Sequence, residues 1–354
     1  MIETLGFNVA RLHPPSGLQG RCNLSIGEEL LHEGQHFVTR DRTTTEGSNT
    51  AEGTRAGYVT LVGRPNAGKS TLLNHLVGEH LSIVTAKAQT TWQRVTGILS
   101  TGNDQMIFLD TPGLLEVRDL LQRTMLGAAL EALAEADIII LVVDATTRPS
   151  SRETVSTLTA LKENAAPLHV ALNKVDIADK EAIRAWEDWV DTELVGSVYR
   201  LSSLTGEGVD TLLVGVRADL PVGPFLYPEQ DIASDPVRFF VAELVRETIF
   251  ELYQQEIPYS TFCQVEEFRE GQNPVYIQVQ IFVERQSQKG ILIGKKGRAI
   301  RELGELARTK VEHFLDERVY LDLWVKPLKA WRKNRAYLSQ LGFRLPEDDE
   351  SSVP

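Results

Sequence analysis

The sequence predicts an α/β domain, with a mostly parallel sheet covered by helices on both faces, followed by a small α+β domain. Three observations favour this fold class. The chain has 354 residues, enough for two domains. Near-continuous apolar runs, typical of strands buried on both faces, alternate with stretches of helical spacing in its first part. After a Pro- and Gly-rich stretch, a different pattern of helices and strands begins.

The elements of the first domain follow one another from residue 58. "YVTLVG" is a β-rich run that ends in a Gly-rich turn, and "KSTLLNHLVG" follows with helical spacing that Gly78 closes. The next predicted strands, "QMIFLD", "ADIIILVVDA" and "LHVALNKVD", lead to Asp110, Asp144 and Asp176. A short strand, "VYRLSS", and a helix, "GVDTLLVGVRADL", complete the domain. Because open α/β sheets bind ligands beyond the carboxyl ends of their strands, these polar ends predict a ligand site.

The second domain has a different order of elements. They are a helix ("RFFVAELVRETIFELY"), two strands around a turn at "GQNP" ("STFCQVEEFRE" and "VYIQVQIFVE"), two helices around "GKKG", and a strand ("VYLDLWVK"). Tyr320 and Trp324 alternate along that last strand, and we expect both in the core. The predicted boundaries are 1–54 for a mostly disordered N-terminal extension with a weak helix near residues 26–32, 55–221 for the α/β domain, 222–236 for a linker, 237–330 for the α+β domain, and 331–354 for a basic and then acidic tail.

Composition excludes several classes of protein. The longest apolar run, 138–143, is far short of the roughly 18 to 20 residues that span a bilayer. Cys22 and Cys263 lie far apart, which predicts neither a disulfide framework nor a zinc site. The start lacks the basic and apolar regions of a secretory signal, so a cytoplasmic protein is expected.

The net charge of −12 is distributed unevenly along the chain. Residues 285–344 contain 15 Lys and Arg against 6 Asp and Glu, so this stretch carries +9 and the rest of the chain −21. A basic stretch on an acidic body is typical of a protein with an anionic partner. A solvated charged face would give the same composition.

The motif "GRPNAGKST" follows a predicted strand and opens a predicted helix. It matches G-x-x-x-x-G-K-[S/T], with Gly63, Gly68, Lys69 and Ser70 at the fixed positions. In such a loop the backbone amides and the helix N-terminus cradle phosphate, the lysine reaches the β and γ phosphates, and the hydroxyl binds Mg²⁺. The motif therefore predicts a nucleoside triphosphate site.

Three further motifs, "DTPG", "NKVD" and "SSL", follow in the order of a GTP-binding domain. Asp110 is expected to hold Mg²⁺ through water, and Gly113 to give its amide to the γ-phosphate. Asn173, Lys174 and Asp176 predict selection of guanine. A carboxylate accepts two bonds from the guanine N1–H and 2-amino group, whereas adenine would leave this acceptor unpaired. Taken alone, "NKVD" would also suit a helix cap.

Together with "KAQTTWQR", these motifs resemble those of the Era family of GTPases. The resemblance implies that Thr91 of switch I, with Thr90 beside it, is a Mg²⁺ ligand along with Ser70 and Asp110. Trp92 stands where the family usually has a basic residue. The implied catalytic group is Lys69, Thr91, Asp110 and Gly113. The other residues implied at the nucleotide site are Asn66, Ala67, Thr71, Thr111, Pro112, and Ser202, Ser203 and Leu204, which supply a backbone amide to guanine.

Leu114 bears on how GTP is hydrolysed. In many small GTPases this position is a glutamine that orients the attacking water, and neither Leu114 nor Leu115 can hydrogen-bond to water. Three interpretations are open: a G domain that does not hydrolyse GTP, a catalytic residue supplied by a partner, or a K⁺ ion beside the phosphates. The resemblance favours the third, with Asn66 as a K⁺ ligand and slow intrinsic hydrolysis that K⁺ stimulates.

The motif "GKKG" lies between two predicted helices of the α+β domain. Its glycines allow close approach of a sugar-phosphate backbone, and its lysines favour phosphate. With its flanking segments it resembles the KH domain of the Era family, which implies binding of small-subunit (16S) rRNA. The residues expected to contact RNA are Gly294, Lys295, Lys296, Gly297 and Arg298 in the loop, and Trp331, Arg332 and Lys333 in the tail, for base stacking and phosphate contact.

The resemblance spans about residues 57–345 and implies a GTP- and Mg²⁺-dependent switch in biogenesis of the 30S ribosomal subunit. Its implied partners are 16S rRNA and the 30S subunit, and a monomer is expected. A peripheral contact with the cytoplasmic face of the cell membrane stays open, because a basic surface also suits anionic lipid. Two alternatives remain: an RNA-binding adaptor whose G domain does not hydrolyse GTP, and a tRNA-modification GTPase resembling MnmE, whose C-terminal cysteine motif this sequence lacks.

Overall fold

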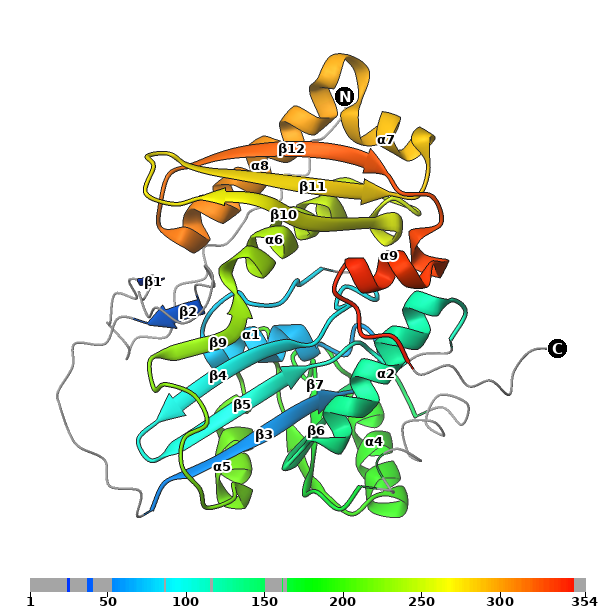
Figure 1. The fold of residues 1–354 in the computed structure, drawn as a ribbon. Coiled ribbons are helices and arrows are strands. Elements are labelled where there is room, and N and C mark those ends of the chain that lie inside the picture. Colours follow the sequence, from blue (N-terminus) through cyan, green and yellow to red (C-terminus); the bar gives the residue numbers. More distant parts are fainter. Residues whose placement is uncertain are drawn as a thin grey trace, which may run out of the picture.

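The computed structural model describes residues 24–25, 37–40, 53–85, 87–114, 117–149, 161 and 164–346. It contains two sheets, each with its own helices (Figure 1). Most of the predicted N-terminal extension, including its helix near residues 26–32, lies outside the described residues, as do Leu115 and the acidic end of the tail. Two short strands of the extension are described, β1 (Leu24–Ser25) and β2 (Phe37–Arg40). No helix in the described ranges is long and apolar enough to cross a membrane.

The larger sheet belongs to the α/β domain, and its centre is parallel as predicted. Its other strands are β3 (Arg55–Val62), β4 (Val95–Thr101), β5 (Asp104–Asp110), β6 (Ile138–Asp144), β7 (Leu168–Asn173), β8 (Ser197–Arg200) and β9 (Asp231–Pro236). The strand order is β1-β2-β9-β4-β5-β3-β6-β7-β8. The β5–β3–β6–β7–β8 part is parallel throughout, whereas β4 and β9 pair antiparallel with their neighbours.

Helices cover both faces of this sheet. They are α1 (Lys69–Val77), α2 (Leu120–Ala134), α4 (Lys180–Glu193) and α5 (Val209–Asp219). Alternate residues of β6 show the two layers: Ile138 and Ile140 pack in the core cluster with α1 and α5, whereas Ile139 and Leu141 pack in the cluster with α4. A strand buried on both faces reads as a continuous apolar run, which is why its sequence predicted a central position.

The predicted linker 222–236 contains a strand, which corrects the expectation of a simple connection. β9 pairs with β4 at Ala233 and Gly97, and with β2 on its other side. Ile232 and Ala233 are buried, and the Asp235 carboxylate accepts a 3.0 Å hydrogen bond from the Thr96 amide. β9 leads at Pro236 directly into the first helix of the second domain. The two domains are therefore joined by ordered secondary structure.

The second domain is α+β, as predicted, with strand order β10-β11-β12. Its elements are α6 (Val237–Leu252), η1 (Pro258–Ser260), β10 (Thr261–Arg269), β11 (Val275–Val283), α7 (Gln286–Ile293), η2 (Lys295–Gly297), α8 (Arg298–Leu315) and β12 (Val319–Pro327). Odd-numbered residues of β11, such as Ile277 and Val279, are buried in the core cluster with α6 and α8. The even-numbered residues of β12 point to the opposite face, where Tyr320 is 59% exposed and Trp324 56%. Their predicted place in the core is wrong, because no helix among the described elements covers that part of the face.

The first part of the predicted tail is folded onto both domains. It forms η3 (Trp331–Lys333) and α9 (Arg335–Gln340), which lie between α2 and the small sheet (Figure 1). Apolar side chains from three regions meet there in what we call the interdomain cluster. Its members are Trp92, Leu121 and Met125 of the α/β domain, Phe262 and Phe282 of the small sheet, and Trp331, Leu338, Leu341 and Phe343 of the tail.

Candidate nucleotide and RNA sites

The P-loop connects β3 to α1 and needs glycine at two positions. Gly63 has φ +145°, and a Cβ there would lie 2.2 Å from the Val142 carbonyl oxygen. Gly68 has φ +100°, and a Cβ there would lie 2.1 Å from Nδ2 of Asn173. A larger residue at either position would strain the backbone and would clash with its neighbours. The motif therefore requires glycine at both positions.

Lys69 begins α1 and points back over the P-loop. Its ammonium donates to the carbonyls of Gly63 (3.1 Å) and Arg64 (3.0 Å). Burial lowers the pKa of Lys69 to about 8, and the negative charge of Asp110 opposes that shift. A phosphate group beside the ammonium would favour its charged form in the same way. The side chain is therefore placed and tuned to pair with an anion.

Three oxygen-bearing side chains converge beside this lysine. Ser70 Oγ donates to Asp110 Oδ2 at 2.7 Å, and Thr91 Oγ1 lies 3.1 Å from Ser70 Oγ and 3.3 Å from Asp110 Oδ2. Burial raises the pKa of Asp110, while the charge of Lys69 and the hydroxyls of Ser70, Ser82 and Thr91 oppose this. Asp110 Oδ1 is buried without a hydrogen-bond partner among the described residues. Mg²⁺ prefers hard oxygen ligands, so this set of donors, with its orphaned carboxylate oxygen, fits the ion.

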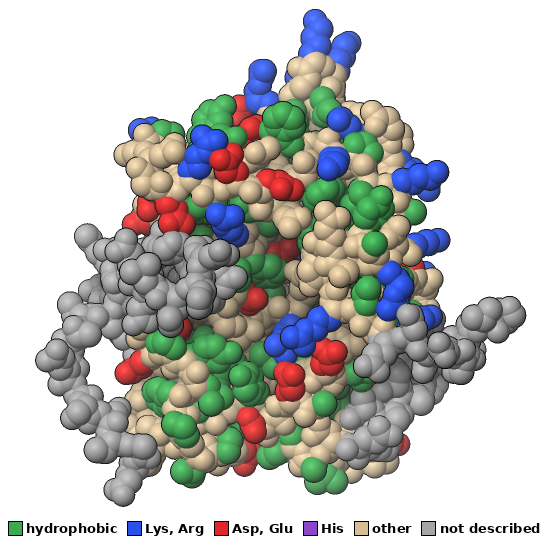
Figure 2. All heavy atoms as spheres, viewed as in Figure 1, with side chains coloured by type: hydrophobic (Ala, Val, Ile, Leu, Met, Phe, Trp, Pro, Cys, Tyr) green, Lys and Arg blue, Asp and Glu red, His purple; other side chains and the backbone are tan. Residues whose placement is uncertain are grey.

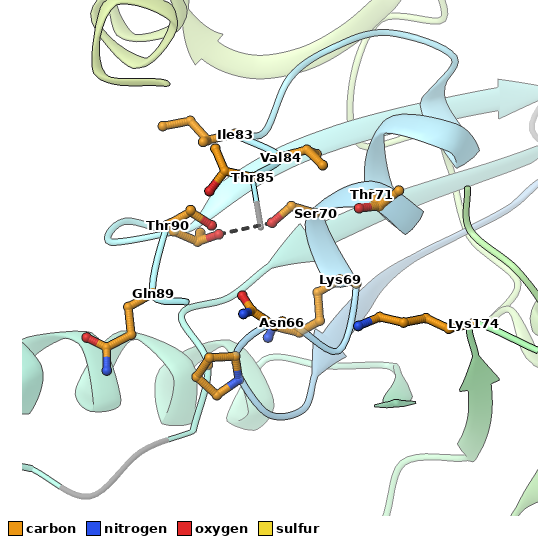
Figure 3. A pocket seen from close by; sticks show the side chains of 14 residues that line it. Asn66, Lys69, Ser70, Thr71, Ile83, Val84, Thr85, Gln89, Thr90 and Lys174 are labelled. Carbon is orange, nitrogen blue, oxygen red and sulfur yellow. Dashed lines mark hydrogen bonds between the residues drawn. The ribbon is translucent and has the colours of Figure 1, made fainter. Parts of the chain in front are cut away.

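A cavity of about 310 Å³ lies over these groups (Figure 3). The P-loop forms one wall, and switch I residues, including Gln89 and Thr90, form the other. Asn66, with φ 64°, and Thr71 also line the cavity. At Gly113, which borders it, a Cβ would lie 2.7 Å from the Pro65 nitrogen. Lys69, Ser70 and Thr91 thus line one space, and Asp110 is joined to it through its hydrogen bonds with Ser70 and Thr91.

The loop after β5 is held from beneath. Thr111 Oγ1 donates to the Leu61 carbonyl at 2.8 Å, and Thr111 and Pro112 are buried. The Leu114 amide donates to the Gly63 carbonyl at 3.3 Å. Leu114 therefore fixes this loop to the P-loop through its backbone.

The guanine-selecting residues follow β7, and Asn173 among them is a structural link. Its Nδ2 donates to the Ala67 carbonyl and its Oδ1 accepts from the Ser203 amide, both at 2.8 Å. Lys174 has φ 67°, and its ammonium donates to Asp144 Oδ2 at 2.6 Å. Asp176 is exposed at the surface. Asn173 thus joins the P-loop to the "SSL" loop and leaves Asp176 as the acceptor for a base.

The "SSL" loop differs in one detail from the prediction that any of its amides serves guanine. The Ser203 amide is directed at Asn173, and Ser202 Oγ accepts from the Thr205 amide at 3.2 Å. Both serines are buried, whereas Leu204 is exposed. Leu204 is therefore the candidate donor in this loop.

The "GKKG" loop joins α7 to α8 and is exposed. Gly294 and Gly297 have φ 69° and 75°, and a Cβ on Gly294 would lie 2.6 Å from the Ala299 Cβ. Lys295, Lys296 and the following Arg298 are exposed at the start of α8. Figure 2 shows Lys and Arg side chains projecting at the top of the view, over the α7–α8 end of the domain. Exposed cations and a helix N-terminus at one place suit a phosphate backbone.

The tail residues depart from the prediction of RNA contact. Trp331 is 0% exposed and donates from Nε1 to the Ser260 carbonyl at 3.1 Å, so the expectation that it stacks on bases is wrong for this structure. Arg332 pairs with Asp119, the N-cap of α2, at 2.6 Å. Lys333 alone of the three is exposed. These residues attach the tail to α2 and the small sheet.

Sequence reasoning missed contacts that the second domain makes with switch I. Arg246 and Glu247 of α6 bond to Thr90 and Val84. Arg246 is nearly fully buried, yet in the sequence it is one charged residue among several in an amphipathic helix. No sequence motif marks Arg246 or Glu247, because their contacts with switch I depend on how the two domains pack together.

Comparisons with known proteins find the same two kinds of domain. The family model described as "50S ribosome-binding GTPase" matches residues 58–174, and the model described as "KH domain" matches residues 256–332. The chain is 40% identical over 292 residues to GTPase Era of Carboxydothermus hydrogenoformans, a match that covers 82% of this chain and 98% of that protein. It is 38% identical over 295 residues to GTPase Era of Geobacter metallireducens, with the same two coverages.

Two solved structures extend the similarity over the whole fold. An Aquifex aeolicus Era variant bound to GDP and AlF4⁻ matches with a TM-score of 0.79 at 37% identity. Era in complex with MgGDPNP and nucleotides 1506–1542 of 16S ribosomal RNA matches with a TM-score of 0.78 at 37% identity. Each match covers 82% of this chain and 100% of the other. The chain therefore belongs to the Era family of GTPases.

Proposed function

We propose that this protein is a GTP-hydrolysing switch that binds 16S rRNA through its KH domain and acts in biogenesis of the 30S ribosomal subunit. One observation carries the proposal. Ser70, Thr91 and Asp110 bring their oxygens together beside Lys69, on the same chain as an exposed "GKKG" loop. A related Era structure holds a GTP analogue and a 16S rRNA fragment together, which supports the same pairing of ligands here.

The residues of the nucleotide site have separate tasks in this proposal. Lys69 pairs with the phosphates, and Gly113, which lines the same cavity, is the candidate amide donor to the γ-phosphate. Asn173 holds the P-loop and the "SSL" loop in register, and Asp176 accepts from guanine. Mg²⁺, held by Ser70, Thr91 and Asp110, supplies charge neutralisation on the phosphates. This intact set favours hydrolysis over a G domain that only binds.

We further propose that intrinsic turnover is slow and that K⁺ stimulates it. The Leu114 side chain offers no hydrogen bond to an attacking water. Asn66 lines the phosphate cavity and is the candidate K⁺ ligand. Turnover measured in matched K⁺ and Na⁺ buffers tests this, with Asn66→Ala as the variant. Equal rates in the two salts would remove the cation from the proposal and leave the GTPase activity standing.

The function is tested by turnover and crosslinking together. We expect purified protein to hydrolyse GTP, and Lys69→Ala to lose turnover while its affinity for a 16S rRNA 3′-end fragment persists. Crosslinks of the full chain to 30S subunits should fall on 16S rRNA and should be stronger in GTP than in GDP. Turnover that survives in Lys69→Ala, or crosslinks independent of nucleotide, would contradict the proposal.

A cytoplasmic monomer remains our prediction for the working state. A peripheral membrane contact is tested by cosedimentation with anionic phosphatidylserine vesicles in the presence and absence of competing RNA. Binding that RNA abolishes would place lipid and RNA on one basic surface, the α7–α8 end.

A further inference from the structure

Switch I, which we take as residues 83–92, is bonded to the KH domain along helix α6. Its hydrogen bonds to α6 come from the last two turns of that helix and its C-cap. They are the Val84 amide to Glu247 Oε1 at 3.1 Å, the Lys87 ammonium to the carbonyls of Phe250 and Tyr253, and Arg246 Nη2 to the Thr90 carbonyl. A segment that must be ordered for GTP hydrolysis is thus held from the second domain.

Lys87 makes the attachment at the end of α6. The last carbonyls of a helix lack intrahelical partners, and the helix dipole leaves this end negative. The Lys87 ammonium satisfies two such carbonyls, those of Phe250 and Tyr253. Switch I therefore supplies the C-terminal cap of a helix in the other domain.

Arg246 makes the attachment closest to the Mg²⁺ residues. Its side chain is 1% exposed, and Glu243 fixes the guanidinium plane by accepting from Nε at 2.8 Å and Nη2 at 2.6 Å. The same guanidinium donates to the Thr90 carbonyl and lies over the Trp92 ring, 4.7 Å from its centroid. A planar, bidentate group held this way has one orientation.

Trp92 is anchored on its other side as well. Its ring stacks on Phe262 with centroids 6.4 Å apart and lies 5.6 Å from the Trp331 ring, inside the interdomain cluster. The residue on each side of Thr91 is therefore fixed by Arg246. These contacts restrict the backbone on both sides of Thr91, whose hydroxyl lies 3.1 Å from Ser70 Oγ.

We propose that Arg246 of the KH domain is a positioning residue for GTP hydrolysis, which places Thr91 at the Mg²⁺ site by holding Thr90 and Trp92. Arg246 contacts no residue of the P-loop among its described bonds, so it acts through switch I. The inference rests on the proposed GTPase function. The aromatic ring at position 92 suits this contact, because it attracts the Arg246 cation, whereas a basic side chain there would repel it.

The test compares Arg246→Lys and Arg246→Met with wild type by steady-state kinetics in GTP and by Mg²⁺ titration of turnover. We expect kcat to fall about tenfold, since one charge-assisted hydrogen bond that orders Thr91 is lost. The Mg²⁺ concentration for half-maximal turnover should rise by roughly the same factor, because the lost order affects a ligand of the ion. The affinity for a fluorescent GDP analogue should change by less than about twofold, since the P-loop and Asp176 are untouched.

Glu251→Gln is the matched control. Glu251 also lies in α6 and pairs with Lys310 at 2.7 Å, but it has no hydrogen bond to the described residues of switch I, so the kinetics of Glu251→Gln should equal those of wild type. GDP-binding stoichiometry measures the folded fraction of each variant, and Arg246→Lys keeps the buried charge if Arg246→Met does not fold. A kcat that falls without any change in the Mg²⁺ requirement, or that stays at the wild-type value, overturns the positioning role. Absence of turnover in wild type would instead overturn the proposed function.

Discussion

Replacing Glu247 by glutamine tests how strongly the two domains are joined. The Glu247 side chain is 4% exposed and lies 2.9 Å from His80 Nε2, 3.1 Å from the Val84 amide and 2.8 Å from Lys310 Nζ. His80 and Val84 belong to the G domain, whereas Lys310 lies in α8. Burial alone would raise the pKa of Glu247, but the hydrogen bonds and charges of His80 and Lys310 lower it to about 2.

The magnitude follows from the difference in pKa between the folded and unfolded chain. A fall from the usual 4.5 to about 2 stabilises the folded protein by about 3 kcal/mol at neutral pH. Because the folded-state pKa is the lower one, this stabilisation is present above pH 4.5 and is lost as the pH falls through about 2. Near pH 3, about 1 kcal/mol of this stabilisation of the folded protein should remain. Glutamine keeps the shape of the side chain without its charge, so the variant lacks this contribution.

The assay is urea unfolding of wild type and Glu247→Gln, followed by circular dichroism at several pH values from 7 down to about 3. The difference in unfolding free energy should be about 3 kcal/mol at pH 7 and should shrink below pH 4.5. Glu251 is the other partner of Lys310, and its side chain is 47% exposed. Glu251→Gln should therefore lower the free energy of unfolding by less than about 1 kcal/mol. A difference that does not depend on pH, or an equally large effect of Glu251→Gln, would refute the reasoning.

Three further predictions concern the two sites and the tail. Gly68→Ala should weaken GDP binding about tenfold or more in isothermal titration, because φ +100° and the 2.1 Å approach to Asn173 both oppose a Cβ; wild-type affinity would contradict this. Exchanging Lys295 and Lys296 for glutamate should lower RNA affinity and reduce the slope of log affinity against log salt by about 1.4, whereas an unchanged slope would mean that these lysines meet no phosphate. Trp331→Ala should lower the free energy of unfolding in urea by about 3–5 kcal/mol, and Trp324→Ala by less than about 0.5 kcal/mol. The reverse order would contradict the buried position of Trp331 and the exposed position of Trp324.

The nucleotide site could be predicted from the sequence because its geometry is local. The P-loop needs glycine for reasons of backbone conformation and close approach, and Lys69 and Ser70 follow it on the same helix. Asp110 ends a buried strand next to the P-loop strand, so the order of the motifs also fixes their neighbours in space. The link that Asn173 makes between two loops of the protein was not predicted, because it joins residues far apart in the sequence.

The two tryptophans of the second domain could not be assigned in the same way. Alternation along β12 shows that Trp324 shares a face with Tyr320, but it does not show which face helices cover. Trp331 lies among Lys and Arg residues, and its burial depends on α2 and the small sheet meeting there. Trp331 is buried because the two domains meet around it. The periodicity of a single sequence does not show where two domains meet.

β9 was missed for a related reason. Its sequence, "DIASDP", has one β-branched residue, Ile232, and no aromatic residue, so it has few of the residues that favour strands. It is a strand because Ile232 and Ala233 pack against the core beside β4, and because Asp235 accepts a bond from Thr96. Tertiary contacts outweighed local propensity there, and a predicted linker became part of the sheet.

The contacts of α6 also determine what moves when GTP is hydrolysed. α8 begins at the "GKKG" loop, and Lys310, roughly three helical turns along it, bonds to Glu247, which holds Val84. One pair of packed helices therefore joins the proposed RNA-binding loop at one end to switch I at the other. The α6 side of switch I is held by hydrogen bonds between protein groups. We expect loss of the γ-phosphate to weaken the P-loop side of switch I, so that switch I leaves the Mg²⁺ site together with the KH domain. Because binding free energies are reciprocal, RNA that favours the attached arrangement must raise GTP affinity by the factor by which GTP raises RNA affinity.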